Sequence, residues 1–169
     1  MSLPLPKYPL QQLLKIKEDR AEEARKVVKQ KEEELKKEEE ALQKLEKERD
    51  KALNHHKDKL LQYRKELDGG TTSEKVTQMK AYLDVTKEKL KAEEAKVKKQ
   101  LERVQKAQTE LENAQTHLKA KIQEVEKIKT HREYWTKETK KELEILEERE
   151  LDETGSLIHN SQTLKKHKS

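Results

Sequence analysis

Residues 68–73 read Asp-Gly-Gly-Thr-Thr-Ser and divide a chain of 169 residues into two long segments rich in helix-forming residues. Each segment carries aliphatic residues at every seventh position. The first series is Leu14, Ala21, Val28, Leu35 and Leu42, and the second is Val76, Leu83, Leu90, Val97, Val104, Leu111, Leu118 and Val125. A seven-residue repeat leaves one narrow apolar seam on a helix, and that seam is buried only against another helix. The two series therefore predict an all-α fold, a long antiparallel two-helix coiled-coil hairpin with unequal arms.

The composition argues against a layered globular core. Hydrophobic residues make up 30% of the chain and charged residues 44%, and large side chains are scarce, with no Phe, one Trp and four Tyr. The abundant Lys, Glu, Leu, Ala and Gln favour helices. Disorder also fits low hydrophobicity and high charge, but a disordered chain has no reason to keep a seven-residue register over about fifty residues. We therefore expect long ordered helices.

Proline and glycine predict where the helices begin and end. All three prolines precede the first series, and Pro9 suits the first turn of a helix. Gly69 or Gly70 can take the left-handed conformation that ends a helix, and Gly155 should end the second helix. The expected organisation is an extended segment 1–8, a hairpin domain 9–153 (helix one 9–68, turn 69–71, helix two 72–153) and a disordered basic tail 154–169.

Folding the chain about the glycine pair places residues opposite one another when their numbers add up to about 141. The last twenty or so residues of helix two then have no helix opposite them, which leaves Trp135, Leu143 and Leu146 uncovered. The extended N-terminal segment is long enough to lie along this overhang, with Leu3 and Leu5 against it.

Polar residues interrupt the seam of helix one. Near Arg49 two successive four-residue steps replace the usual alternation of three and four, and Lys31 and Glu38 occupy other seam positions. A capping-box spacing, Thr71 followed by Glu74, predicts that helix two begins near residue 72. We expect weaker pairing in the middle of the hairpin than at its ends.

The sequence contains no catalytic, cofactor-binding or metal-binding motif, so we expect no enzymatic activity and no cofactor. Without Cys, neither disulfides nor thiolate metal sites can form. His55 and His56 project about 100° apart on a helix and do not form a metal-binding pair. The 40 basic and 35 acidic residues alternate along both helices, which argues against nucleic-acid binding. With no transmembrane span and no secretory signal in residues 1–10, we expect a cytoplasmic protein without membrane insertion.

Aromatic residues gather at two places and are the candidates for partner binding. Tyr63 and Tyr82 flank the turn, while Tyr8, Tyr134 and Trp135 lie together at the open end. Aromatic side chains carry much of the binding energy at protein interfaces, although they could equally secure the ends of the hairpin. The partner-binding candidates are Tyr8, Tyr82, Tyr134, Trp135, Leu143 and Leu146.

Nearly the whole chain resembles a known family. The residues that carry the resemblance are Tyr8 to Glu18 (Tyr-Pro-Leu-Gln-Gln-Leu-Leu-Lys-Ile-Lys-Glu), Ala21, Ala24, Arg132, Trp135 and Glu150 to Glu153. They are similar to the opening and the C-terminal helix of the FliJ/YscO-like proteins of flagellar and virulence-associated type III secretion. Opening, turn, length and ending agree in order, and the chain looks most like the YscO- and CdsO-type virulence branch.

The resemblance implies a non-enzymatic central stalk that docks in the hexameric type III secretion ATPase. It also implies contacts with the export gate and with secretion chaperones, and a peripheral location at the inner-membrane secretion apparatus. By analogy with rotary ATPases, the end bearing the termini would enter the ring and the turn would face the gate. The family's gate-contacting stretch falls on residues 82–93, where Tyr82 keeps the expected aromatic character and Thr86, Lys89 and Glu93 are polar.

Two other functions fit the same residues. A generic coiled-coil scaffold would self-associate through the overhang of helix two, whereas the stalk is expected to be a monomer when isolated. A nucleic-acid-binding helical arm would need a basic face, and the alternation of Lys and Glu argues against one.

Overall fold

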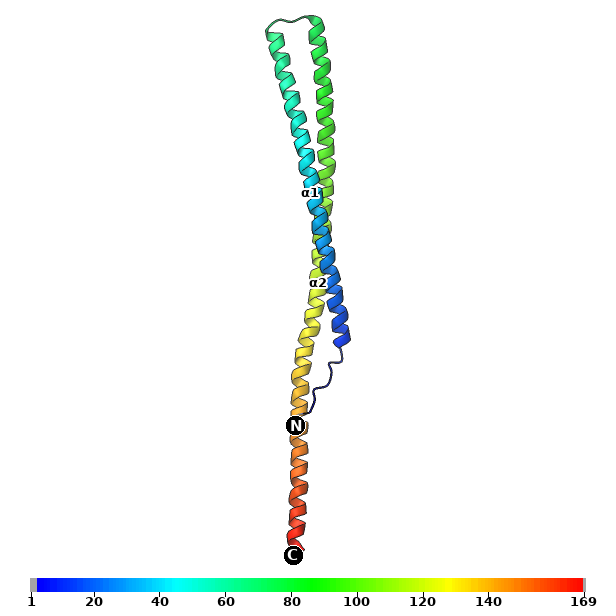
Figure 1. The fold of residues 1–169 in the computed structure, drawn as a ribbon, viewed down its shortest axis with the longest axis vertical. Coiled ribbons are helices and arrows are strands. Elements are labelled where there is room, and N and C mark those ends of the chain that lie inside the picture. The colour runs from blue at the N-terminus through cyan, green and yellow to red at the C-terminus, as the bar shows by residue number, and fades with distance from the viewer. Residues whose placement is uncertain (1–2, 169) are drawn as a thin grey trace. The chain divides into compact units, whose positions relative to one another are not determined.

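The structure, a computed structural model, describes residues 3–168 and contains two α-helices (Figure 1). Helix α1 spans Gln11–Asp68 and α2 spans Ser73–His167, with lengths of 58 and 95 residues. No β-strand occurs between residues 3 and 168. The predicted all-α architecture with arms of unequal length is confirmed.

Ion pairs between the helices establish their antiparallel arrangement. The pairs are Lys17–Glu124, Lys31–Glu110 and Glu66–Lys75, with nitrogen–oxygen distances of 2.9, 3.2 and 3.1 Å. In each pair the two residue numbers add up to 141. The register predicted from the glycine pair is therefore confirmed.

Capping interactions shape the turn between the helices. The amide of Gly69 donates to the carbonyl oxygen of Lys65 at 3.0 Å, and Gly70 has a φ of 75°, the left-handed conformation that favours glycine. The Oγ1 of Thr72 accepts a hydrogen bond from the amide of Lys75 at 3.4 Å. The N-cap of α2 is thus Thr72, one residue beyond the predicted Thr71.

Helix α1 begins two residues later than expected. Pro9 and Leu10 form a turn, and the first helical hydrogen bond runs from the amide of Leu14 to the carbonyl oxygen of Leu10 at 2.9 Å. Residues 3–8 form neither helix nor strand, in keeping with the predicted extended segment; Met1 and Ser2 of that segment lie outside the described residues.

The predicted end of the second helix is wrong. Helix α2 continues through Gly155 to His167, so residues 154–167 are helical and not a disordered tail; Ser169 lies outside the described residues. A glycine in a helix interior costs only about 1 kcal/mol relative to alanine, and no proline follows it. Side chains on both sides of the glycine bond back to the helix, as Thr154 Oγ1 does to the oxygen of Glu150 at 2.7 Å. A single glycine is therefore not enough to end this helix.

Contacts divide the chain into two compact units. The terminal unit comprises Met1–Ala24 and Leu118–Ser169, and the turn unit comprises Arg25–His117. Neither helix, as far as residues 3–168 extend, includes a stretch long and apolar enough to cross a membrane.

The terminal unit has an apolar core. Leu14 is 1% exposed and forms a buried cluster with Ala21 and Val125, against which the half-buried Ile128 packs. All four residues are aliphatic, and the interhelix ion pair of Lys17 with Glu124 lies beside them. This packing is the seam that the seven-residue repeat predicts.

The turn unit buries smaller and more polar side chains. Its buried aliphatic residues include Ala52, Val104 and Ala107, and two of its most buried residues are polar, Thr86 at 4% and Gln100 at 6% exposure. The seam leucines of this unit remain half-buried. Its helices are therefore held by hydrogen bonds and ion pairs as well as by apolar contact.

Candidate functional site

An aromatic cluster joins the N-terminal segment to α2 in the terminal unit. The ring of Tyr8 meets the ring of Trp135 edge-on, with centroids 5.4 Å apart, and lies 5.8 Å from the ring of His131. The Tyr8 hydroxyl and His131 Nδ1 share a hydrogen bond of 2.6 Å. Because Tyr8 is only 9% exposed, the cluster fixes the N-terminal segment and offers little free surface.

The N-terminal segment continues along the overhang of α2. The amide of Leu3 donates to the Glu147 carboxylate at 2.5 Å. Leu3 and Leu5 are 37% and 43% exposed, so they cover the helix only in part. The predicted course of this segment is confirmed, while its leucines are less buried than expected.

The other partner-binding candidates of this unit differ in their exposure to solvent. Trp135 and Leu143 are half-buried, whereas Tyr134 is 64% exposed and Leu146 is 47% exposed. Neighbouring residues on a helix project about 100° apart, so Tyr134 points away from the direction in which Trp135 meets Tyr8. Tyr134 and Leu146 are the candidates that remain available to a partner.

An apolar stripe lies farther along α2 and was not predicted. It consists of Leu151, Leu157, Ile158 and Leu164, which are 72%, 71%, 53% and 65% exposed. The sequence reading missed these residues because it ended the helix at Gly155. Their spacing, with steps of six, one and six residues, gathers them on one side of a helix.

The remaining predicted residue, Tyr82, lies in the turn unit. It is 46% exposed, and its hydroxyl shares a hydrogen bond of 3.0 Å with His55 Nε2. The Lys59 ammonium lies 5.5 Å from the centroid of its ring. Tyr82 also borders an open cavity of about 200 Å³ that Met79 and Leu83 help to line. Half of this aromatic side chain is free to meet a partner.

A buried hydrogen-bond pair follows one turn along α2. The Thr86 hydroxyl donates to the oxygen of Leu83 at 2.9 Å, so its oxygen accepts from His56 Nδ1 at 2.7 Å. A hydroxyl has one proton to give, which places the second proton of this pair on His56 Nδ1. His56 is half-buried and contacts α2 through this bond, so the structure places it in the seam. No group of three or more potential metal ligands gathers anywhere in residues 3–168.

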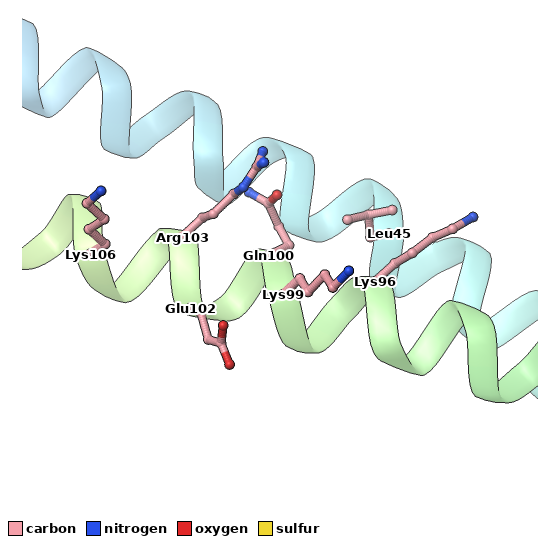
Figure 2. Close-up of a pocket in the computed structure, with 7 residues that line it drawn as sticks. All are labelled: Leu45, Lys96, Lys99, Gln100, Glu102, Arg103 and Lys106. Carbon is pink, nitrogen blue, oxygen red and sulfur yellow. The ribbon is translucent and has the colours of Figure 1, made fainter.

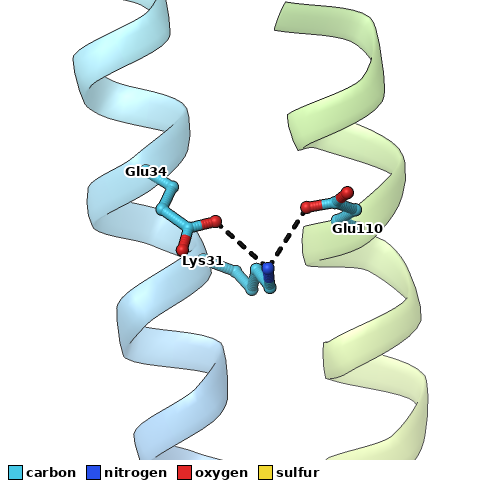
Figure 3. Close-up of polar contacts among 3 residues, drawn as sticks. All are labelled: Lys31, Glu34 and Glu110. Atoms are coloured by element: carbon cyan, nitrogen blue, oxygen red, sulfur yellow. Dashed lines mark hydrogen bonds and ion pairs between the residues drawn. The ribbon is translucent and has the colours of Figure 1, made fainter. Parts of the chain in front are cut away.

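Charged groups also bridge the seam of the turn unit. The ammonium of Lys31 donates to the carboxylates of Glu34 and Glu110 at 3.1 and 3.2 Å (Figure 3). The hydrogen bond to Glu34, and then that to Glu110, raises the pKa of the Lys31 ammonium above its ordinary 10.5. Farther along, Gln100 Nε2 donates to the backbone oxygen of Glu38 at 2.9 Å and to its carboxylate. Both predicted polar seam positions, Lys31 and Glu38, therefore contact α2.

The terminal unit has a corresponding ion pair at its rim. Lys17 donates to the Glu124 carboxylate at 2.9 Å, and Lys121 approaches the other oxygen of that carboxylate at 3.6 Å. The hydrogen bond from Lys17 lowers the pKa of Glu124 below its ordinary 4.5. Glu124 therefore keeps its charge in mildly acidic solution.

A basic groove runs along α2 in the turn unit. The groove has a volume of about 610 Å³ and is lined by Leu45 of α1 and by Lys96, Lys99, Gln100, Glu102, Arg103 and Lys106 of α2. Figure 2 shows Gln100 and Arg103 reaching toward α1, while Glu102 points to the opposite side. The expectation that no basic face exists is wrong at this place. Glu102 interrupts the basic residues in sequence but not on the helix surface.

Comparison with known proteins identifies the family. Residues 5–165 match the family described as YscO-like protein. The chain belongs to the YscO-like family. The solved structure of CT670 from Chlamydia trachomatis, a candidate YscO homologue, is 46% identical in sequence and superposes with a TM-score of 0.90. The match covers 95% of this chain and 99% of the Chlamydia chain. A search of curated proteins returns no significant match.

Family membership confirms the resemblance seen in the sequence. The chain is a type III secretion-associated protein, and the members of its family are components of the secretion apparatus. The family match extends over both helices, so the terminal unit and the turn unit both belong to it.

Proposed function

We propose that this chain is the non-enzymatic central stalk and coupling component of a bacterial type III secretion system. It docks in the hexameric secretion ATPase and links that enzyme to the export gate and to secretion chaperones at the inner membrane. The observation that carries the proposal is the exposed apolar surface of α2 in the terminal unit, on a chain that matches the YscO-like family over residues 5–165.

The terminal unit is the proposed ATPase-binding end. Tyr134 and Leu146 are about half or more exposed, and the stripe from Leu151 to Leu164 follows them on the same helix. At about 100° per residue, Leu146 lies on the same side of α2 as the stripe and Tyr134 on the other side, so apolar side chains are exposed on two sides of this segment. Such a segment suits insertion between the subunits of a ring, where both sides would become buried. Trp135 supports this end indirectly, because it is held against Tyr8.

The turn unit is the proposed gate-binding end. Tyr82 and Val85 are 46% and 62% exposed and lie one turn apart on α2. Aromatic and aliphatic residues at this spacing form a small hydrophobic anchor. The nearby Thr86 and Glu93 face the interior or other polar groups, so we assign the contact to Tyr82 and Val85.

The direct test mixes the chain with its cognate secretion ATPase and measures binding, oligomer size and hydrolysis rate. We expect the chain to bind the ATPase. Tyr134→Ala should weaken this binding by about tenfold, because it removes one aromatic anchor. The control Lys137→Ala, at an exposed neighbouring residue, should bind as tightly as the unsubstituted chain. Tyr82→Ala should weaken binding to the export gate protein and leave ATPase binding unchanged. Absence of binding together with unchanged hydrolysis and oligomer size would refute the proposal.

Self-association is the second candidate function, and the apolar stripe of α2 favours it. A scaffold that pairs through this overhang would form dimers in the micromolar range, whereas the stalk remains a monomer near 20 kDa. Sedimentation equilibrium of the wild-type chain and of Leu157→Glu distinguishes the two. Dimers that the substitution abolishes would favour the scaffold.

A further inference from the structure

Four basic residues form one stripe on α2 of the turn unit. Lys96, Lys99, Arg103 and Lys106 follow one another in steps of three, four and three residues, and all four line the groove shown in Figure 2. At about 100° per residue this spacing keeps side chains on one face of a helix for about three turns, a length of about 15 Å. The stripe is therefore a continuous line of positive charge.

Most of this charge is not neutralised by the part of the chain that the structure describes. Lys96 forms an ion pair with Glu93 at 3.2 Å. Lys99, Arg103 and Lys106 are exposed and make no hydrogen bond or ion pair with any of residues 3–168. The contrast is Lys31 in the same unit, whose ammonium is held between two carboxylates. Three cations thus remain available to an external anion.

The groove beside the stripe is partly apolar. Leu45 contributes a half-buried aliphatic surface from α1, and the buried amide of Gln100 is bonded to Glu38. A volume of about 610 Å³ accommodates a few side chains of a partner and not a whole helix. A ligand would lie over the groove and insert an aliphatic group toward Leu45.

We propose that this groove is a docking site for an acidic amphipathic helix of a partner protein. Carboxylates spaced three and four residues apart on such a helix would meet Lys99, Arg103 and Lys106, while a leucine or similar side chain would enter beside Leu45. Charge pairing of this kind sets the register and orientation of the helix and increases its association rate. The proposal does not depend on the stalk function.

The lining favours a protein helix over a nucleic acid. It contains no aromatic residue on which a base could stack, and it includes the aliphatic side chain of Leu45. The spacing of three and four residues matches a helix lying alongside α2. A phosphate backbone would contact the cations but would gain nothing from Leu45.

The experiment measures binding of a labelled synthetic helix to the full chain by fluorescence anisotropy. The probe is a peptide of about 18 residues, long enough to be partly helical, with glutamates and leucines on one face and alanines elsewhere. The variant K99E/R103E reverses two charges of the stripe. The matched control, K87E/K98E, reverses two exposed lysines of the same helix that project about 120–140° away from the stripe.

We expect saturable binding that K99E/R103E weakens by about tenfold or more and that K87E/K98E leaves within about twofold. Raising the salt from about 0.05 M to about 0.5 M should weaken binding, because exposed charges are screened. A lysine version of the peptide should not bind. Circular dichroism of both variants checks that the helices remain folded.

Four results would overturn the proposal. The first is absence of peptide binding up to about 1 mM, which corresponds to a free energy weaker than about −4 kcal/mol. The second is an equal loss of peptide affinity in K99E/R103E and in K87E/K98E, which would indicate non-specific attraction. The third is that the chain binds single-stranded RNA and not the peptide, and that K99E/R103E abolishes the RNA binding. Self-association lost in K99E/R103E would identify a second copy of this chain as the occupant and would also contradict a separate partner.

Discussion

The terminal unit and the turn unit use the same two helices but hold them together differently. In the terminal unit the seam is aliphatic around Leu14, which is 1% exposed. In the turn unit the seam contains the buried polar residues Thr86 and Gln100. It also contains Lys31, which donates hydrogen bonds to two carboxylates. Apolar packing stabilises an interface, whereas buried polar groups specify its register at some cost in stability. We infer that the terminal unit is the more stable of the two and the turn unit the more adaptable.

The largest effect is expected from a substitution in the terminal core. Leu14→Ala should lower the free energy of unfolding by about 2–4 kcal/mol, because it leaves a cavity beside Ala21 and Val125. Urea unfolding followed by the fluorescence of Trp135, the single tryptophan of the chain, reports on this unit. The control Leu13→Ala, at a residue 39% exposed, should cost less than about 1 kcal/mol. Equal effects of the two substitutions would show that the core is not centred on Leu14.

A smaller effect is expected when a polar contact is removed from the turn unit. Thr86→Val keeps the shape of the side chain but removes the acceptor of His56 Nδ1, which should cost about 1–2 kcal/mol. Thermal unfolding monitored by circular dichroism measures the loss. Thr86→Ser retains the hydroxyl and serves as the comparison. If serine destabilises more than valine, the methyl group and not the hydrogen bond holds this position.

The comparison also shows how far sequence reasoning reaches. The repeat from Val76 to Val125 predicted the hairpin and its register, because every seam residue constrains the same helix phase. The end of α2 was mispredicted, since the cost of a single Gly155, about 1 kcal/mol, is too small to end a helix. The helix propensity of one residue does not show whether the residues around it extend the helix past that residue.

For the candidate site, the sequence paired Tyr8 with the region of Trp135 correctly, because their numbers fit the register. It could not tell which of Tyr134 and Trp135 faces the N-terminal segment, since the overhang has no opposing helix to set its phase. The basic groove escaped notice because Glu102 stands between Lys99 and Arg103 in sequence. Only the angular position of each residue around the helix shows that Glu102 projects to a different side from Lys99 and Arg103.

Removal of one hydroxyl from the terminal cluster should have a modest effect. Tyr8→Phe retains the ring that packs on Trp135 and deletes the hydrogen bond to His131, which should cost about 1 kcal/mol. Limited proteolysis of residues 3–8 and urea unfolding measure the change. We expect faster cleavage of this segment and a largely unchanged turn unit. Unchanged cleavage would show that the ring alone anchors the segment.

The smallest effects should appear in the response of the two units to pH. The pKa of Glu124 is lowered, so its pairing with Lys17 stabilises the terminal unit above about pH 4.5 and is lost as the pH falls through the folded-state pKa. The pKa of Lys31 is raised, so its contribution to the turn unit is fully present below about pH 10.5 and is lost as the pH rises through the folded-state pKa. One unit is affected by acid and the other by alkali.

Unfolding curves at several pH values test this difference. Glu124→Gln should flatten the acid limb of the stability profile and leave the alkaline limb unchanged, while Lys31→Gln should do the reverse. An exposed Glu126→Gln variant supplies the control for loss of a carboxylate elsewhere on α2. Identical profiles for Glu124→Gln and Glu126→Gln would contradict a specific role of the Lys17 pair.

Hydrogen–deuterium exchange of the chain alone and with its cognate secretion ATPase tests the account most directly. For the free chain, we predict slower exchange near Leu14 and Val125 than near Gln100. With the ATPase, we predict new protection along α2 from Tyr134 to Leu164 and none around Tyr82. Protection confined to the turn unit, or no change on adding the ATPase, would contradict the assignment of the terminal unit as the docking end.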